Sequence, residues 1–238
     1  MIVVDKLKLL RGDQLVLGGL TVNHPTLGQI YSFGEENYWS VASQLTATPF
    51  DYKVALDDVG LDWEEVDPFS LFLDIRSNFP KEATSVFFGD VDLSSLYLVE
   101  GQSGLALCND GMEIYIDKPV YECIVEFIRD INGIEKFKWK PGNAATKRQY
   151  IEDDRRALRR KRKKPFSSMI SPLVSSLVNS EGFKYDYSTV WGLHIYTFMD
   201  SVKRIQKIKN YDNLMFGIYT GNLEYKKVKS ELNWLEEL

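Results

Sequence analysis

Apolar residues recur at helical spacing over most of the chain. The first such stripe lies between Pro25 and Pro49 and consists of Leu27, Ile30, Tyr31, Tyr38, Val41, Ala42 and Leu45. Because residues three and four apart share one face of an α-helix, this stripe predicts a helix that begins near Thr26. Gly34 interrupts the pattern and is expected to divide the helix in two.

Similar stripes, each bounded by Gly, Pro or a capping residue, predict helices over most of the remaining chain. The first three are residues 50–60, a helix capped by Asp67 with Pro68 in its first turn, and residues 119–133. A long helix from Asn143 to just before Pro165 follows, and then residues 166–182, in which Pro172 can introduce a kink. The last are two helices within 186–221 and a short amphipathic tail at 230–238.

Two parts of the chain have the composition of β-strands instead. Residues 1–22 predict one or two short strands, and residues 84–119, rich in Val, Phe, Tyr and Ile, predict three or four antiparallel ones. Asp110-Gly111 lies between "LALC" and "EIYI" and is a strong hairpin signal. The string "EGQSG" predicts a turn, since it lacks the Gly-Lys-Ser/Thr ending of a phosphate-binding loop.

Together these elements predict an α+β fold that is mainly α-helical, with one small antiparallel β-sheet in the middle of the chain. The expected parts are residues 1–83 with N-terminal strands and helices, 84–118 with the small sheet, and 119–238 with helices that include the long basic one. With 44% hydrophobic residues, the chain can bury a core, as one or two intimately packed domains.

Charge is distributed unevenly along this chain of 238 residues, whose net charge is −5. The segment from Lys147 to Lys164 holds ten basic and three acidic residues, and the rest of the chain carries −12. The apolar stripe of the predicted helix, through Ala144, Ile151 and Leu158, is narrower than that of a core helix. Its last turns are therefore expected to be solvated or to lie against an acidic surface.

The candidate interaction residues are the basic side chains at the end of this helix. They are Arg155, Arg156, Arg159, Arg160, Lys161, Arg162, Lys163 and Lys164. Contact with a protein is the favoured interpretation, ahead of a plain solvated face and of phosphate contacts with nucleic acid. The chain is acidic overall and has no recognised nucleic-acid-binding module, which disfavours the last of these.

Catalytic and metal-binding patterns are weak, so we expect a protein that is not an enzyme and needs no metal or cofactor. Its two cysteines, Cys108 and Cys123, and its two histidines, His24 and His194, lack the spacing of metal ligands. Of its paired carboxylates, Asp57-Asp58, Glu64-Glu65 and Asp90/Asp92, the last pair would share one face if it lay on a strand, where Mg²⁺ could bind. A turn or strand-edge role is much the stronger expectation for that pair.

Aromatic residues accumulate towards the C-terminal end, with Trp191, Phe198, Phe216, Tyr219 and Trp234 among them. A core is the favoured interpretation, and an interface is the alternative, because Tyr and Trp often anchor protein contacts. No stretch reaches the length of a membrane span, and the N-terminal residues lack the apolar segment of a secretory signal. A soluble protein of the cytoplasm is the expectation.

Three strings of the sequence resemble tail morphogenesis proteins of tailed phages and prophages of Gram-positive bacteria. They are "PTLGQIYSFGEENYWS", "LTATPFDYKVALDDVGLDWEEVDPFSLF" and "EGFKYDYSTVWGLHIYTFMDSVKRIQKIKNYDNLMFGIYTGNL". The resemblance implies a tail assembly chaperone or a tail or baseplate component of the virion. Its implied partners are other phage tail proteins and copies of the chain itself. The alternative is a nucleic-acid-binding accessory protein that uses the basic run 147–164.

Overall fold

The computed structural model describes residues 5–101, 104–111, 113–135, 141–161 and 165–236. The fold is α+β and mainly helical, as the sequence predicts, with 59% of the residues in helices. It has two small antiparallel sheets instead of the single sheet expected, because the N-terminal strands form a hairpin of their own.

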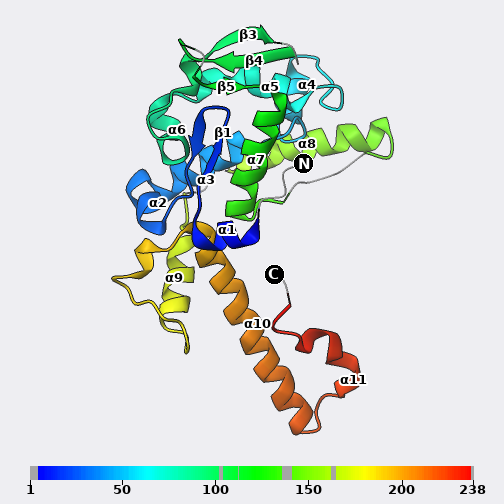
Figure 1. Cartoon of the computed structure of the whole chain (residues 1–238). Helices are drawn as coiled ribbons and strands as arrows, with labels where there is room; N and C mark the ends of the chain where they lie inside the picture. The colour runs from blue at the N-terminus through cyan, green and yellow to red at the C-terminus, as the bar shows by residue number, and fades with distance from the viewer. Residues whose placement is uncertain (1–4, 102–103, 112, 136–140, 162–164, 237–238) are drawn as a thin grey trace.

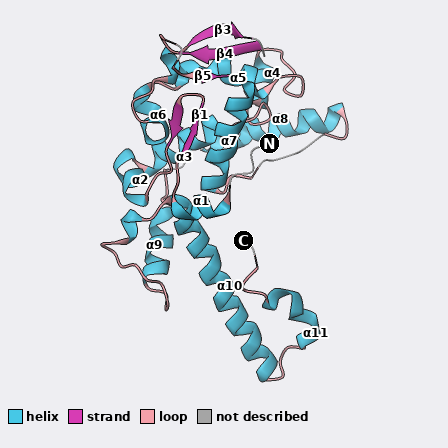
Figure 2. Cartoon of the chain, in the orientation of Figure 1, coloured by secondary structure: helices cyan, strands magenta, loops and turns pink. Residues whose placement is uncertain are grey.

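The helices follow one another along the whole chain (Figure 2). The α-helices are α1 (Lys6–Arg11), α2 (Leu27–Phe33), α3 (Glu35–Leu45), α4 (Lys53–Asp58), α5 (Pro68–Ile75), α6 (Lys81–Phe88), α7 (Lys118–Asn132), α8 (Ala144–Lys161), α9 (Ile170–Val178), α10 (Ile195–Tyr219) and α11 (Tyr225–Val228). Short 3-10 helices are η1 (Arg76–Asn78), η2 (Leu93–Ser95), η3 (Val190–Gly192) and η4 (Lys229–Leu232). The strands are β1 (Leu15–Leu17), β2 (Leu20–Val22), β3 (Tyr97–Gly101), β4 (Gly104–Cys108) and β5 (Tyr115–Ile116).

The molecule has a rounded body and a protruding arm (Figure 1). Both sheets and the helices from α1 to α8 lie in the body, and α8 projects from one side of it. The arm consists of α10, which extends away from the body, and of α11 and η4, which turn back beside it. We use the word arm below for residues 195–236.

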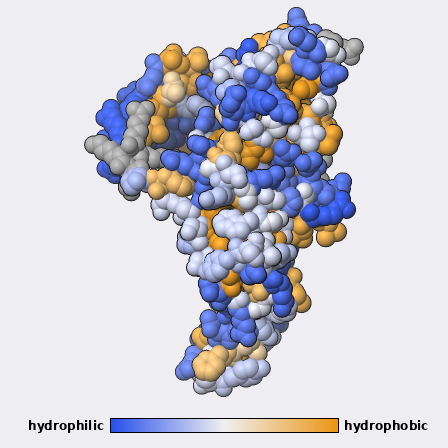
Figure 3. Space-filling model, turned by 90° about the vertical axis from the view of Figure 1, so that its left-hand side faces the viewer, coloured by the Kyte–Doolittle hydropathy of each residue, from blue (hydrophilic) through white to orange (hydrophobic). Residues whose placement is uncertain are grey.

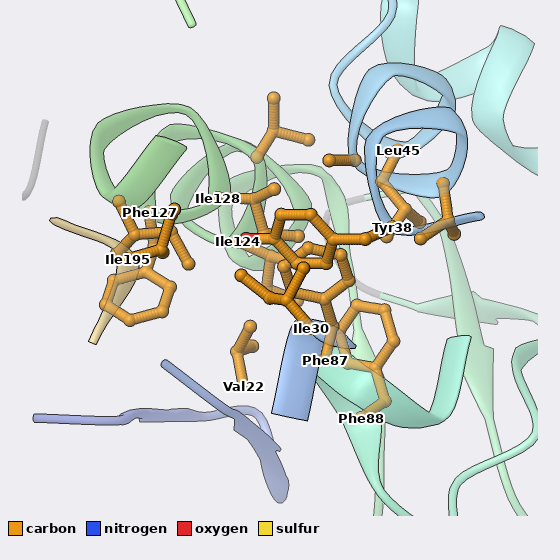
Figure 4. Close-up of a cluster of buried hydrophobic side chains, with 14 of the residues drawn as sticks. Val22, Ile30, Tyr38, Leu45, Phe87, Phe88, Ile124, Phe127, Ile128 and Ile195 are labelled. Atoms are coloured by element: carbon orange, nitrogen blue, oxygen red, sulfur yellow. The ribbon is translucent and has the colours of Figure 1, made fainter. Parts of the chain in front are cut away.

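The core of the body is rich in aromatic rings, which gather around α7 (Figure 4). Tyr38 is fully buried, its ring stacks on Phe87 with a centroid distance of 5.3 Å, and its hydroxyl donates to Asn132 of α7. Burial raises the pKa of Tyr38 far above its usual value, so the hydroxyl stays protonated. Tyr38 therefore joins α3, α6 and α7 through packing and through one hydrogen bond.

Both sheets are built on antiparallel hairpins. In the first, Leu17 pairs with Leu20 across a two-glycine turn, and both Gly18 and Gly19 have positive φ. In the second sheet, of order β3-β4-β5, Cys108 pairs with Tyr115 on either side of the predicted Asp110-Gly111 turn. The first hairpin tip touches the second sheet, since Tyr115 N–H donates to the Gly18 carbonyl at 2.8 Å.

The helix starts predicted from capping residues are confirmed. Thr26 forms a capping box with Gln29, and Gly34 separates α2 from α3. The Asp67 carboxylate accepts from two backbone N–H groups of α5, and Asn143 Oδ1 accepts from Thr146 N–H at 2.9 Å. These local signals fix where each helix begins in the sequence.

Several other predictions are wrong. Residues 1–22 contain the two short strands predicted there, but α1 (Lys6–Arg11), which the sequence does not predict, precedes them. Residues 81–88, which overlap the expected sheet region, form α6. The segment 186–221 holds a single long helix, α10, preceded by η3. Pro172 does not kink α9, because it lies in the first turn, where no N–H is required.

The junction between body and arm combines backbone and side-chain contacts. Leu27 N–H donates to the Leu193 carbonyl, and Ile195 N–H donates to the Pro25 carbonyl, at 2.9 and 3.0 Å. Glu35 of α3 accepts from the first N–H groups of α9, with Oε1 2.9 Å from the nitrogen of Ile170. A body carboxylate thus caps the helix that precedes the arm. Within the described ranges, no helix is long and apolar enough to cross a bilayer.

Candidate interaction surface on the basic helix

The helix α8 packs on α4 through a narrow contact. Of its apolar residues, Ile151 is buried, whereas Tyr150 and Leu158 are exposed. Hydrophobic burial alone therefore holds α8 weakly, because a single fully buried aliphatic side chain contributes only about 1.5–3 kcal/mol. Ion pairs supply the rest of the contact.

Lys147 anchors the first half of α8. Its ammonium forms ion pairs with Asp62 and Glu64, the second at 2.6 Å, and lies 5.1 Å from the centre of the Trp63 ring. Partial burial alone would lower the pKa of Lys147, but the hydrogen bonds to the two carboxylates outweigh it and raise the pKa. The "DWEE" segment, which includes the Glu64-Glu65 pair, thus forms the acidic contact for the first half of α8.

Arg155 anchors the second half in the same way. Its guanidinium contacts Asp57 at 3.1 Å and Asp58 on α4, and Glu152 at 2.7 Å on its own helix. Asp57 and Asp58 are adjacent in sequence, and both carboxylates contact this one arginine. Arg155, one of the predicted interaction residues, is therefore engaged by carboxylates of its own chain.

A third ion pair between α4 and α8 has the opposite arrangement, with the lysine on α4 and the carboxylate on α8. Lys53 of α4 has only 3% of its side chain exposed, and its ammonium contacts Asp154 of α8. The same ammonium lies 3.9 Å from the centre of the Phe50 ring and donates to the Phe50 carbonyl at 3.2 Å. A lysine this deeply buried requires such partners, because a buried charge without them is strongly destabilising.

The outer face of α8 carries the remaining described basic residues. Arg156 pairs with Asp153 of the same helix at 3.6 Å, while Arg159 and Arg160 are exposed and make no ion pair within the described ranges. Arg148 is likewise exposed and unpaired there. Lys161 ends the helix, and Arg162, Lys163 and Lys164 lie outside the described residues. The available positive surface of α8 is therefore Arg148, Arg156, Arg159 and Arg160.

An open groove of about 410 Å³ runs along the side of α8. Trp63, Arg148 and Ile151 line it, and the indole Nε1 of Trp63 is buried without a hydrogen-bond partner among the described atoms. Asp57, Asp62 and Glu152 also line the groove, so its charge is mixed and indicates no single class of ligand.

The other candidate groups have structural roles. Asp90, in a turn, pairs with Lys81 at 2.6 Å, and Asp92 caps η2, so the pair has the turn role that was the stronger expectation and does not share the face of a strand. In the described part of the chain, no three His, Cys, Asp or Glu side chains gather as metal ligands would. His24 and His194 contact each other at the junction of body and arm, which no sequence spacing indicates.

The arm exposes a second surface. Only Ile195, Phe198 and Val202 of α10 are buried, all near its start. The element η4 lies against α10, and Glu236, which follows it, forms an ion pair with Lys207. Phe216 and Tyr219 remain 70% and 80% exposed. The molecule narrows at the arm, whose surface shows hydrophobic patches (Figure 3). The core interpretation of the C-terminal aromatics is right for Phe198 and wrong for Phe216 and Tyr219.

The fold is that of a mainly helical protein with exposed basic residues on α8 and exposed apolar residues on the arm. Residues 161–238 match a family model described as the YomV second domain, and that family is associated with bacteriophages. The match covers α9, η3 and the arm, less than half of the chain, and it is a weak pointer to a phage-related protein. No curated protein and no solved structure matches the chain.

Proposed function

We propose that the chain is a non-enzymatic phage tail morphogenesis protein that acts through protein–protein contacts. The observation that carries the proposal is the arm, where large apolar side chains stay exposed in the segment that resembles a phage family. Monomeric proteins seldom expose such groups together without a partner. Tail proteins, and further copies of this chain, are the partners proposed.

The arm has the properties of a docking element. Its exposed apolar residues lie on the far half of α10 and on the returning segment, where Tyr225 and Leu235 add to Phe216 and Tyr219. Aromatic side chains of this kind give large contact area at a small cost in conformational entropy. A partner that covers them would gain most of its binding energy there.

The outer face of α8 would contribute a second, electrostatic contact. Arg156, Arg159 and Arg160 are solvated, so a rim contact with an acidic neighbour would speed association and set orientation more than it would raise affinity. Added salt should therefore weaken the contact that α8 makes with a partner and leave the contact made by the arm unchanged.

The test is genetic, in the phage or prophage that encodes the chain. Deletion of the gene should give lysates with heads but without complete tails in electron micrographs. The wild-type gene should restore tails, and a Phe216→Ser/Tyr219→Ser variant that accumulates in folded form should not. Normal tailed particles without the gene would overturn the proposal. The chain in purified virions would favour a structural component, and its absence there an assembly chaperone.

Nucleic-acid binding is a second candidate, supported by the unpaired Arg148, Arg159 and Arg160 on α8. Such contacts would be weakly specific and would weaken steeply with salt. We expect a gel shift of duplex or single-stranded DNA at low salt, abolished by replacing Arg159, Arg160, Lys161 and Arg162 with Ser. No shift at low salt would exclude this candidate.

A further inference from the structure

A second open groove lies on the body, on the other side from the acidic partners of α8. It measures about 690 Å³ and runs between α2 and α6. Its lining is Asn23, Thr26, Gly28, Gln29, Ser32, Phe33, Ser85 and Val86. None of these residues is charged, which is unusual for an open groove on a chain with 26% charged residues.

The polar side chains of this groove are held in place and retain unused hydrogen-bonding capacity. The side-chain oxygen Oδ1 of Asn23 accepts from Gln14 Nε2 at 2.9 Å, and the side-chain oxygen Oε1 of Gln29 accepts from Thr26 N–H at 2.8 Å. The NH₂ groups of Asn23 and Gln29 make no hydrogen bond with the described residues. The hydroxyl of Ser32 donates to the Gly28 carbonyl at 3.0 Å, which leaves its lone pairs free to accept.

The backbone of the groove offers little to a ligand. Residues 28–33 and 85–86 lie in α2 and α6 and not on a strand, Gln29 N–H donates to the Thr26 hydroxyl at 3.2 Å, and Asn23 N–H donates to the Phe87 carbonyl at 2.7 Å. An extended peptide binds chiefly through unpaired backbone groups of a strand edge, which this lining lacks. The groove therefore suits a ligand that hydrogen-bonds to amide and hydroxyl side chains.

An aromatic pair stands at the Gly28 side of the groove. Trp191 and Tyr31 have ring centroids 5.7 Å apart, and Tyr31 is 75% exposed. Trp191 is held by a hydrogen bond of 2.9 Å from its Nε1 to the Tyr187 carbonyl. Gly28 permits this arrangement, because a Cβ there would lie 3.2 Å from the Trp191 carbonyl oxygen. Pale side chains, of intermediate hydropathy, cross the middle of this side of the molecule (Figure 3).

We propose that the α2–α6 groove with the Tyr31–Trp191 pair binds a neutral carbohydrate. A neutral sugar chain presents many hydroxyl groups, which both donate and accept, and an apolar ring face of C–H groups that packs on an aromatic ring. The groove matches both properties, with uncharged amides and hydroxyls along its length and exposed rings at its side. This binding is independent of the arm and of the proposed role in assembly.

The experiment is calorimetric titration of the full chain with neutral hexasaccharides built from glucose, galactose, mannose or N-acetylglucosamine. An oligogalacturonate of equal length serves as an anionic comparison. We expect saturable binding of at least one neutral hexasaccharide, about tenfold weaker in Tyr31→Ala. Tyr219→Ala is the matched control, since it removes an equally exposed tyrosine from the arm and should leave affinity unchanged.

Three results would overturn the proposal. They are no binding of any neutral hexasaccharide at millimolar concentration, binding that Tyr31→Ala leaves intact, and equal or tighter binding of oligogalacturonate, which would point to the arginines of α8. Circular dichroism checks that the Tyr31→Ala protein is folded. The Trp191→Phe variant keeps a ring and should weaken binding less than the double variant Tyr31→Ala/Trp191→Ala.

Discussion

The rings of His24 and His194 lie 4.8 Å apart although the residues are separated by 170 positions. His194 Nδ1 donates to the His24 carbonyl at 2.6 Å, and the His24 ring accepts through Nε2 from Tyr196 N–H at 3.4 Å. A protonated His24 could not accept this bond. Body and arm therefore meet at an imidazole that must stay neutral.

The first prediction concerns acid stability. Burial, helped by the neighbouring His194, lowers the pKa of His24 to about 4, and the opposing charge of Asp13 only partly offsets it. The unfolded chain takes up this proton near pH 6.5, so folding stability should fall as the pH drops from 6.5 to 4, by about 3 kcal/mol in all. Urea unfolding at several pH values should show this loss, and His24→Gln should remove it. Parallel pH profiles for both proteins would contradict the prediction.

The second prediction concerns Glu35, which caps α9 from α3. Its partial burial tends to raise its pKa, but hydrogen bonds from Ser168 and from the backbone of Ile170 and Met169 lower it overall. Its stabilising effect should be present at neutral pH and lost as the pH falls through its lowered pKa. Glu35→Gln should cost about 1.5–3 kcal/mol at pH 7 and about nothing at pH 2. Glu36→Gln, next to it and exposed, is the control and should be silent in thermal unfolding.

The third prediction concerns the buried Lys53. Asp154→Ala should destabilise the protein by about 3–5 kcal/mol, because it leaves a buried ammonium with only the Phe50 carbonyl and ring. The double variant Lys53→Met/Asp154→Ala should recover much of this loss. Chemical denaturation measures both, and Asp153→Ala, on the outer side of α8, should change stability by less than about 1 kcal/mol. A double variant no better than Asp154→Ala would argue against the reason given.

The fourth prediction separates strain from close contact at two glycines with similar φ. Gly19 and Gly60 have φ of 75° and 76°, but a Cβ on Gly19 would lie 1.7 Å from the Glu113 carbonyl oxygen, whereas Gly60 has open space. Gly60→Ala should therefore cost about 1–2 kcal/mol from strain alone. Gly19→Ala should cost clearly more and disturb the amide signals around Glu113 in NMR spectra. Equal costs would show that the hairpin tip moves freely away from the sheet.

The sequence predicts local features of this fold well. Thr26, Asp67 and Asn143 place helix starts correctly, because a cap depends on residues within one turn. Residues 84–88 were misjudged, since Thr, Val and Phe favour strands in isolation. In the structure, Thr84, Phe87 and Phe88 are buried at helical spacing, and this tertiary packing overrides their propensity.

The candidate surface was predictable in part. The described part of the basic run, up to Lys161, lies on a narrow-striped helix as predicted, but the sequence does not distinguish Arg155, which contacts Asp57 and Asp58, from Arg159, which does not. That distinction depends on how α8 lies across α4, over about a hundred residues of separation. Contacts of this range, like the one between His24 and His194, leave no periodic trace in the sequence.

The length of α10 sets the distance between the body and the exposed residues at the tip of the arm. Beyond Val202, its last buried residue, the helix continues for 17 residues to Tyr219, which at 1.5 Å per residue carries its tip about 25 Å from the body. A helix of this length is stiff, so whatever binds Phe216 or Tyr219 is held at a fixed distance from whatever binds the body. Insertion or deletion of one helical turn within residues 203–215 would change the distance between the tip of α10 and the body without altering the residues at either end.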